Sequence, residues 1–96
     1  MYKVYVIQNN HSFEMYIGRT NDLERRLSEH NAGQQEATRR KSGEWVLIYA
    51  EAYRDKKDAI QRELRLKNHG RAKQELYKRI PNSLLSNPES GAGRSD

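Results

Sequence analysis

Cysteine is absent from this chain of 96 residues, which excludes disulfide bonds and zinc sites that use thiolate ligands. Apolar residue types make up only 34% of the chain, so the hydrophobic core must be thin. The longest unbroken apolar run, residues 45–50, is far shorter than the roughly 20 residues that span a bilayer. No Gly-rich phosphate loop and no Gly-x-Ser-x-Gly motif occurs. We therefore expect a soluble cytoplasmic protein without a membrane partner.

Positive charge is what the chain has in excess, with 18 lysines and arginines against 13 acidic residues and a net charge of +5. Fixed cations attract polyanions, and phosphate backbones are the commonest such partners. An acidic membrane surface is the other polyanion that this positive charge could attract. At this length we expect one folded domain, residues 1–81. Residues 82–96 are rich in Ser, Gly and Asn, which predicts a disordered tail.

Three segments have the composition of β-strands. Residues 2–7 and 15–17 are rich in β-branched and aromatic types, and the polar residues 9–11 between them predict a turn. These segments together predict an antiparallel hairpin. Residues 45–53 are nearly continuous in apolar types, apart from Glu51. Such a run is typical of a strand covered on both faces, which predicts a central position in the sheet.

The first helical pattern lies between Asn21, which has the residue type of an N-cap, and Gly33, which supplies a left-handed stop. The residues that share one face of this helix are Leu23, Arg26, Leu27 and His30. The arginine and the histidine are one turn apart, so their side chains can converge on one spot. Taken alone, such a pair is more often just the rim of an amphipathic helix.

Two further helices follow the long apolar strand. Asp55 predicts the cap of a helix over residues 56–69, and Gly70 predicts its end. The last helix has an apolar residue at every fourth position and ends at Pro81. The polar and basic residues 34–44 predict a mobile loop. These elements indicate an α+β domain with a small sheet covered by helices.

Glu63 is the most diagnostic position of the second helix. Measured from Ala59 at 100° per residue, it lies at about 40°, inside the arc that also holds Leu66 and Ile60. A solvated glutamate would lie on the opposite side of the helix. The structural interpretation is a half-buried ion pair with Lys67, one turn further on. The functional interpretation is a catalytic or metal-binding acid.

The remaining candidates are tyrosines and basic residues. Tyr5 and Tyr16 belong to the two hairpin strands, where a tyrosine usually just fills one face of the sheet. The residues expected to contact nucleic-acid phosphates are Arg19, Arg39, Arg40, Lys41, Lys67, Arg71 and Lys73. Cations of this kind are equally what a domain with a thin core uses for solubility.

In combination these residues resemble the GIY-YIG endonuclease family, particularly the small stand-alone bacterial members related to the amino-terminal nuclease domain of the UvrC repair protein. The first motif is represented by Lys3-Val4-Tyr5 and the second by Tyr16-Ile17-Gly18. Residues 19–30 are similar to the family's helix, and residues 59–63 to the segment that carries its metal-binding glutamate. The resemblance covers about residues 2–80. Lys3 replaces the leading glycine of the family, and the late asparagine of some members is not evident.

The resemblance implies a three-stranded antiparallel sheet flanked by about three helices. It also implies metal-dependent hydrolysis of DNA phosphodiester bonds, in repair or recombination, with RNA still open as a substrate. The implied catalytic residues are Tyr5, Tyr16, Arg26, His30 and Glu63. Glu63 would hold magnesium, or alternatively manganese, and Arg26 would bind a phosphate oxygen. Tyr5, Tyr16 or His30 would orient or deprotonate the attacking water. We favour Tyr5 as the base, which requires that Arg19, Arg26 or the ion lower its pKa, and Tyr16 as the group that positions the water.

Two other functions stay open. A nucleic-acid-binding module with a vestigial nuclease site would bind DNA in a salt-sensitive way without magnesium-dependent nicking. A protein-interaction scaffold would show no salt-dependent affinity for DNA. A partner protein and the oligomeric state are also open.

Overall fold

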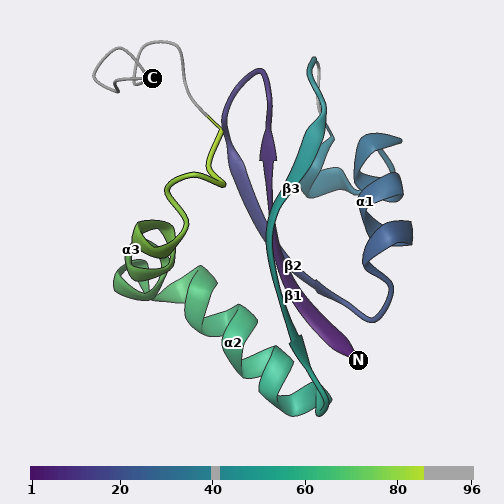
Figure 1. The fold of residues 1–96 in the computed structure, drawn as a ribbon. Helices are drawn as coiled ribbons and strands as arrows, with labels where there is room; N and C mark the ends of the chain where they lie inside the picture. Colours follow the sequence, from purple (N-terminus) through teal and green to yellow (C-terminus); the bar gives the residue numbers. More distant parts are fainter. Residues whose placement is uncertain (40–41, 86–96) are drawn as a thin grey trace.

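The computed structural model describes residues 1–39 and 42–85, in which a sheet lies between helices on its two faces (Figure 1). The elements in chain order are β1 (Tyr2–Asn9), β2 (Met15–Thr20), α1 (Leu23–Asn31), the 3-10 helix η1 (Glu36–Thr38), β3 (Trp45–Tyr53), α2 (Lys56–Asn68) and α3 (Gly70–Arg79). This is the α+β arrangement that the sequence predicts. No helix in the described residues is both long and apolar enough to cross a membrane.

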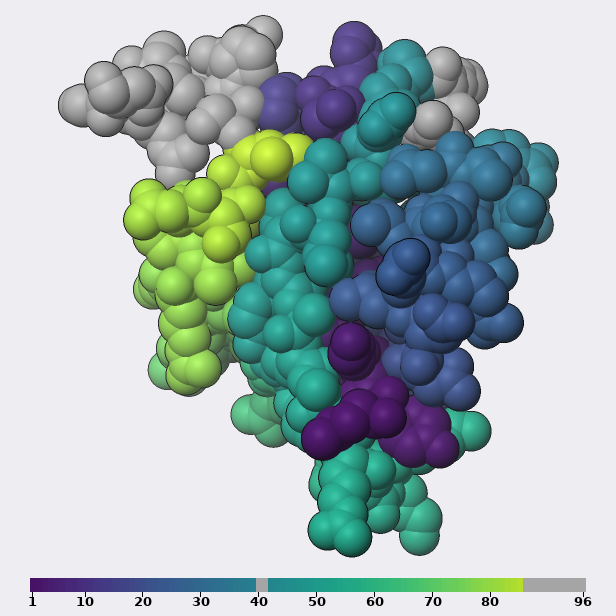
Figure 2. Space-filling view, turned by 45° about the vertical axis from the view of Figure 1, so that its right-hand side comes forward, coloured from purple at the N-terminus to yellow at the C-terminus, as the bar shows by residue number. Residues whose placement is uncertain are grey.

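The sheet has the strand order β2-β1-β3, and both neighbouring pairs are antiparallel. The predicted central position of β3 is therefore wrong, because β3 is an edge strand and β1 is the central one. Figure 2 shows β3 (teal) at the surface between α3 (yellow-green) and α1 (blue). The strand buried on both faces is β1, whose residues 4–9 are all buried. In β3 the apolar run still alternates between half-buried and exposed positions, so an apolar composition did not require burial on both faces.

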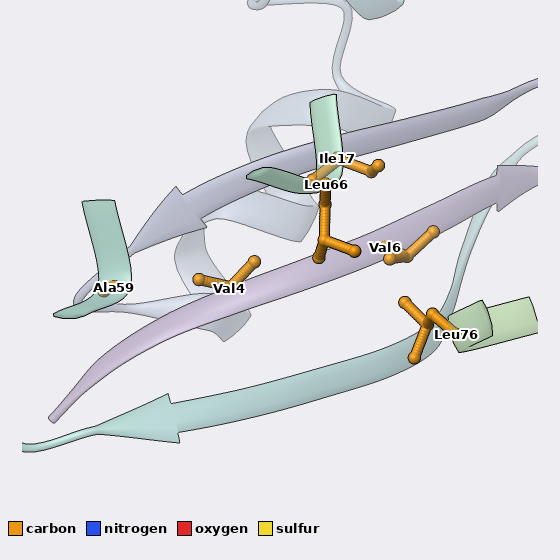
Figure 3. Packing of buried hydrophobic residues seen from close by; sticks show 6 residues of the cluster. All are labelled: Val4, Val6, Ile17, Ala59, Leu66 and Leu76. Atoms are coloured by element: carbon orange, nitrogen blue, oxygen red, sulfur yellow. The ribbon is translucent and has the colours of Figure 1, made fainter. Parts of the chain in front are cut away.

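Alternate side chains of β1 point to two separate clusters. Val4 and Val6 pack with Ala59 and Leu66 of α2 and with the α3 residue Leu76 (Figure 3). On the other face, the buried residues are Tyr5, Ile7 and Trp45, and they pack against Tyr16, Leu23 and Leu27. The strand period of two thus assigns α2 and α3 to one face of the sheet and α1 to the other.

The helix ends differ from the predicted ones by a residue or two. Asp22 rather than Asn21 caps α1, because its carboxylate accepts a hydrogen bond from the Arg25 backbone N–H. Asp55 caps α2 as predicted, through the N–H of Lys57. Since α3 begins at Gly70, only His69 separates the last two helices.

The segment predicted as a mobile loop contains ordered structure. Residues 36–38 form η1, and Thr38 at its end is almost completely buried. The Trp45 indole N–H donates to the Thr38 carbonyl over 2.7 Å, which fastens this segment to the start of β3. Residues 40 and 41 lie outside the described residues.

The chain is also ordered for four residues beyond Pro81, where we predicted the tail to begin. Residues 81–83 form a turn, and the Leu85 backbone N–H donates to Oε1 of Gln8 over 2.8 Å. The folded part therefore extends at least to Leu85, because the backbone N–H of Leu85 is the partner of the buried side-chain amide of Gln8 in β1. The rest of the predicted tail, residues 86–96, lies outside the described residues.

Candidate active site

Two tyrosines of the hairpin meet on the α1 face of the sheet. Tyr5 is paired with Gly18 across the β1–β2 ladder and Tyr16 with Ile7, so the two phenol rings are diagonal neighbours. Their ring centroids are 6.4 Å apart. A Cβ at Gly18 would collide with the Tyr5 hydroxyl and would lie 2.5 Å from Tyr5 Cζ and 2.9 Å from Cε2 of Tyr16. Glycine is therefore the residue that leaves room for both rings.

His30 of α1 lies against both phenols and is fully buried. Its Nε2 is 2.7 Å from the Tyr5 hydroxyl, and its Nδ1 is 2.5 Å from the Thr38 hydroxyl. Because the Thr38 hydroxyl donates to the carbonyl of Gln35, we assign the imidazole proton to Nδ1 and the role of acceptor to Nε2. Tyr5 then donates its proton to His30. The edge of the Tyr16 ring faces the same imidazole, with centroids 5.0 Å apart.

Burial controls protonation in this cluster. Burial, together with the nearby Arg26 guanidinium, lowers the pKa of His30 below its ordinary value of 6.5, so the imidazole is neutral near pH 7. Burial also raises the pKa of Tyr5 well above its ordinary value, and the neighbouring Tyr16 adds to that increase. The protein's own groups do not lower the pKa of Tyr5 below its ordinary value. The charge of Arg26 acts in that direction, but desolvation outweighs it.

Arg26 approaches the same spot from the preceding turn of α1. Its Nε is 3.4 Å from Oε1 of Glu29, but this nitrogen is buried and makes no hydrogen bond within the described residues. This N–H is therefore ion-paired with Glu29 but lacks a well-aligned hydrogen-bond acceptor. The site thus contains a donor that an anionic oxygen would satisfy.

Glu63 reaches the site from α2, on the other face of the sheet. Arg19 of β2 donates from Nε to Oε1 of Glu63 over 3.2 Å, and Nζ of Lys67 is 3.0 Å from Oε2. The predicted Glu63–Lys67 pair is therefore confirmed. The same Lys67 ammonium lies 5.5 Å from the centroid of the Tyr16 ring. Because β2 is an edge strand, the two halves of the site meet around that edge, through Lys67 and Tyr16.

A hydrated ion held by one carboxylate fits this donor set. No group of three or more His, Asp or Glu side chains in the described residues could hold a metal together. Magnesium keeps several waters and often uses one or two protein carboxylates. Glu63 offers one carboxylate, but Arg19 and Lys67 pair with its two oxygens, so a divalent ion could bind only where it displaces one of these cations. Lys67 is exposed and flexible enough to leave Oε2 when another cation binds.

The structure brings together only some of the predicted residues. Tyr5, Tyr16 and His30 are in mutual contact, and the charges of Arg26 and Glu63 both act on the Tyr5 phenol. Arg19 is a partner of Glu63 in this structure, and its predicted contact with phosphate stays a prediction. Among the other predicted phosphate contacts, Lys67 and Lys73 lie beside the site. Arg39 and Arg71 lie apart from it, and Arg40 and Lys41 are outside the described residues.

Those outlying residues have different positions. Arg39 is exposed after η1 and donates from Nε to the Gly33 carbonyl over 3.2 Å. Lys73 of α3 lines a groove of about 420 Å³ together with Tyr16 and Lys67, so it lies next to the site. Arg71 lines a different groove, between α2 and α3. Arg40 and Lys41 are not among the described residues.

Sequence patterns missed two residues that build the site. Thr38 holds the imidazole of His30, yet nothing in the spacing of a polar loop marks one threonine for this role. Gly18 is part of a recognised motif, but the sequence does not show that it leaves room for the Tyr5 and Tyr16 rings. That role depends on the register that places Gly18 opposite Tyr5.

Comparison with known proteins identifies the family. The model of the GIY-YIG catalytic domain matches residues 1–93. The chain belongs to the GIY-YIG family. The domain is thus of a nuclease type, and the predicted resemblance is confirmed.

Relatives of this GIY-YIG protein occur in bacteria and archaea. A UPF0213 protein of Bacillus pumilus is 40% identical over 63 residues, which are 66% of this chain and 64% of that protein. A UPF0213 protein of Halobacterium salinarum is 37% identical over 75 residues, covering 78% of this chain and 96% of the relative. The chain thus spans slightly less than two thirds of the Bacillus relative.

One solved structure is similar to this GIY-YIG domain along its whole length. It is the solution NMR structure of a UPF0213 protein from Bacillus halodurans, with 26% sequence identity and a TM-score of 0.50. The match covers 98% of this chain and 96% of that one. The fold is therefore shared by a UPF0213 protein from another organism.

Proposed function

We propose that this GIY-YIG protein is a metal-dependent endonuclease that hydrolyses phosphodiester bonds of DNA. The observation that carries the proposal is the position of Tyr16. Its ring contacts the buried imidazole of His30 on one side and the Lys67 ammonium, which is paired with Glu63, on the other. A proton-accepting group and a carboxylate that attracts cations therefore flank one phenol at the edge of the sheet.

Hydrolysis requires a water molecule to attack phosphorus in line while charge grows on the phosphate oxygens. Arg26 is the group that would stabilise this charge, because its buried Nε is ion-paired with Glu29 but makes no hydrogen bond in the described residues. A phosphate oxygen would supply the acceptor, and the interaction would strengthen as the oxygen becomes more negative. The planar guanidinium suits two oxygens of one phosphate better than a lysine would.

Proton removal from the water would use the pair of Tyr5 and His30. With its raised pKa, Tyr5 stays protonated at neutral pH and is a donor to Nε2 of His30. It can accept a proton from water only as it passes its own proton to the imidazole, which Thr38 holds in the required tautomer. Tyr16, half-buried beside them, would position the water. One proton moves from water to Tyr5 and one from Tyr5 to His30. The two transfers together leave an imidazolium beside the cleaved phosphate.

Glu63 is the residue that would hold a divalent ion, magnesium first and manganese as the alternative. Such an ion supplies positive charge for the leaving oxygen. Arg19 would keep the carboxylate oriented, since its bond to Oε1 leaves the other oxygen accessible once Lys67 moves.

The test compares the parent with Glu63→Ala on supercoiled DNA, with magnesium and with EDTA. We expect magnesium-dependent nicking by the parent and a loss of about 100-fold or more in the variant, because a single metal ligand is removed. Glu14→Ala, which removes an exposed carboxylate of the hairpin turn, is the matched control and should nick at the parental rate. Nicking that survives Glu63→Ala would overturn the proposal.

A second candidate function has one specific observation in its favour. Both oxygens of Glu63 have cationic partners in the structure, as expected if the acid is structural and the domain only binds nucleic acid. This function predicts salt-sensitive binding of DNA without magnesium-dependent nicking. The same assay therefore distinguishes the two functions, and repeating it with RNA determines which nucleic acid is cleaved.

A further inference from the structure

Helix α2 presents different chemistry on the two sides of its buried stripe. Measured from the buried Ala59, Glu63 and Lys67 lie at about 40° and 80°, and Arg62 and Arg65 at about −60° and −120°. The first flank borders the β2 edge and carries the candidate active site. The second flank borders β3, because Arg62 is bonded to Glu51 of that strand. The two flanks thus face away from each other across the helix.

The second flank lines a groove between α2 and α3 of about 540 Å³, which we call the arginine groove. Its charged and polar lining residues are Arg62, Arg65, His69, Arg71, Glu75 and Arg79. On α3, the lining residues 71, 75 and 79 recur at every fourth position, so they form one row along the helix. Ala72 and Leu76 complete the lining.

The charges in the arginine groove are not balanced by the protein. Arg62 is neutralised by Glu51, which accepts from its Nε over 2.9 Å and from its Nη2 over 3.0 Å. Arg65, Arg71 and Arg79 have no ion pair within residues 1–39 and 42–85. Glu75 is the one acid among the lining residues. Three unpaired guanidinium groups around one concavity repel one another, and an anionic ligand would remove that repulsion.

Guanidinium groups in a concave row match the oxygens of successive phosphates, to which each can donate two parallel hydrogen bonds. A flat membrane surface would meet only the rim of such a groove. We propose that the arginine groove binds the phosphodiester backbone of a nucleic-acid segment different from the one held at Tyr16 and Glu63. This proposal rests on the proposed function only for the identity of the polyanion, because the groove itself contains no residue of the candidate active site.

The first experiment measures binding without cleavage, in EDTA, over a series of salt concentrations. Arg65→Gln/Arg79→Gln removes two unpaired charges from the groove, one on each helix. Lys56→Gln/Lys57→Gln removes two exposed charges at the start of α2 and is the matched control. We expect the groove variant to lower the slope of log Kd against log salt by about 2, and the control by less than half of that. At low salt the groove variant should bind DNA about tenfold more weakly than the control.

Equal slopes and affinities in the two variants would overturn the proposal. So would release of DNA from the parent by polyglutamate as readily as by polyphosphate, because the groove would then prefer a carboxylate partner such as an acidic peptide. All four charged residues are exposed, so both variants should fold, and their thermal unfolding checks this directly.

The second experiment maps which nucleotides lie in the groove. Since the chain lacks cysteine, Glu75→Cys gives a single thiol in the groove and Lys67→Cys a single thiol beside the candidate active site. Each carries a photoactivated cross-linker and is bound to the same end-labelled DNA in EDTA. We expect cross-links to two separate segments of the DNA, and overlapping positions would refute a second segment. Neither readout needs cleavage, so failure of the nicking assay and failure of this proposal are distinguishable.

Discussion

Gly18 is the residue on which the spacing of the two phenols depends. It lies directly opposite Tyr5 in the β1–β2 ladder, and the Tyr5 and Tyr16 rings occupy the space that any larger residue would need. The φ angle of Gly18 is not in the left-handed region, so the requirement is for space and not for backbone freedom. A glycine inside a strand usually weakens it, and here the loss of strand propensity is offset by the contact that it permits.

We expect Gly18→Ala to displace the Tyr5 hydroxyl from His30. Overpacking of this kind should lower the free energy of unfolding by about 1–3 kcal/mol. A shift of about 1 Å in the site should lower the nicking rate by about 100-fold. Gly70→Ala is the matched control, because a Cβ there meets nothing within 4 Å, and it should be neutral or slightly stabilising. Thermal unfolding and the supercoiled-DNA assay measure both effects, and equal behaviour of the two variants would contradict this explanation.

At the residue scale, predictions based on local spacing were confirmed and those based on environment were not. The Glu63–Lys67 pair follows from positions one turn apart on one helix, and the structure contains it. The sequence shows which cations could lie near Tyr5 but not how deeply the phenol is buried, and burial is what raises its pKa. The catalytic roles of Tyr5, Tyr16, Arg26, His30 and Glu63 stay predictions.

At the scale of elements, a polar cluster joins the edge strand β3 to α2. Glu51 accepts from the hydroxyls of Tyr49 and Tyr53 and from the guanidinium of Arg62. Burial opposes its charge, but these donors together lower the pKa of Glu51 below its ordinary value of 4.5. Burial and the bond to Glu51 raise the pKa of Tyr53 to about 12, so Tyr53 remains a donor. Glu51, the polar exception in the apolar run, is thus the link between two elements.

Glu51→Gln should therefore weaken the attachment of β3 to α2. The amide keeps the shape but removes the charge-assisted bonds to Arg62, so we expect a loss of about 2 kcal/mol in the free energy of unfolding. For a domain of this size that corresponds to a decrease of roughly 10 °C in Tm. Glu14→Gln changes an exposed carboxylate of the hairpin turn and should leave Tm within about 3 °C of the parent. A Tm for Glu51→Gln equal to that of Glu14→Gln would exclude a stabilising role.

The elements themselves were predicted well and their neighbours less well. Caps and apolar periods are local signals, and they located α2 and α3 within two residues of their observed bounds. The position of β3 was predicted wrongly. Its apolar composition resembles that of a central strand, but β3 pairs only with β1 and lies at the edge of the sheet. Strand order depends on which faces the helices cover, and no single segment carries that information.

At the scale of the whole molecule, one chain of hydrogen bonds connects the sheet, α1 and the segment after it. It runs from Tyr5 through His30 to Thr38 and on to the Gln35 carbonyl. The chain requires a neutral imidazole, because Nε2 accepts the proton of Tyr5. Protonation of His30 would break this bond and place a charge beside Arg26 in a buried site.

Stability should consequently depend on pH in a defined window. The pKa of His30 is lowered by folding, so the unfolded chain binds more protons, and the stabilisation is complete above the unfolded pKa of 6.5. It is lost as the pH falls below 6.5 towards the folded pKa. We expect Tm to decrease from pH 7 to pH 5 and this decrease to be smaller in His30→Gln. His11→Gln removes an exposed histidine, and its Tm should decrease with falling pH as steeply as that of the parent. Identical profiles of Tm against pH for the parent and both variants would contradict the role assigned to His30. Glu51 contributes in a separate window, below pH 4.5.

The sequence alone determined the elements of this protein, its family motifs and the helical face that carries Glu63, because each depends on residues within one or two turns or one strand. Only the tertiary structure decided that β1 is central, that Thr38 orients His30, and that Arg19 holds Glu63 from 44 positions away in the chain. It also decided that burial raises the pKa of Tyr5 and that the unpaired arginines of α2 and α3 share one groove. Those features depend on burial and on contacts between distant segments, and both arise only when the sheet is covered on its two faces.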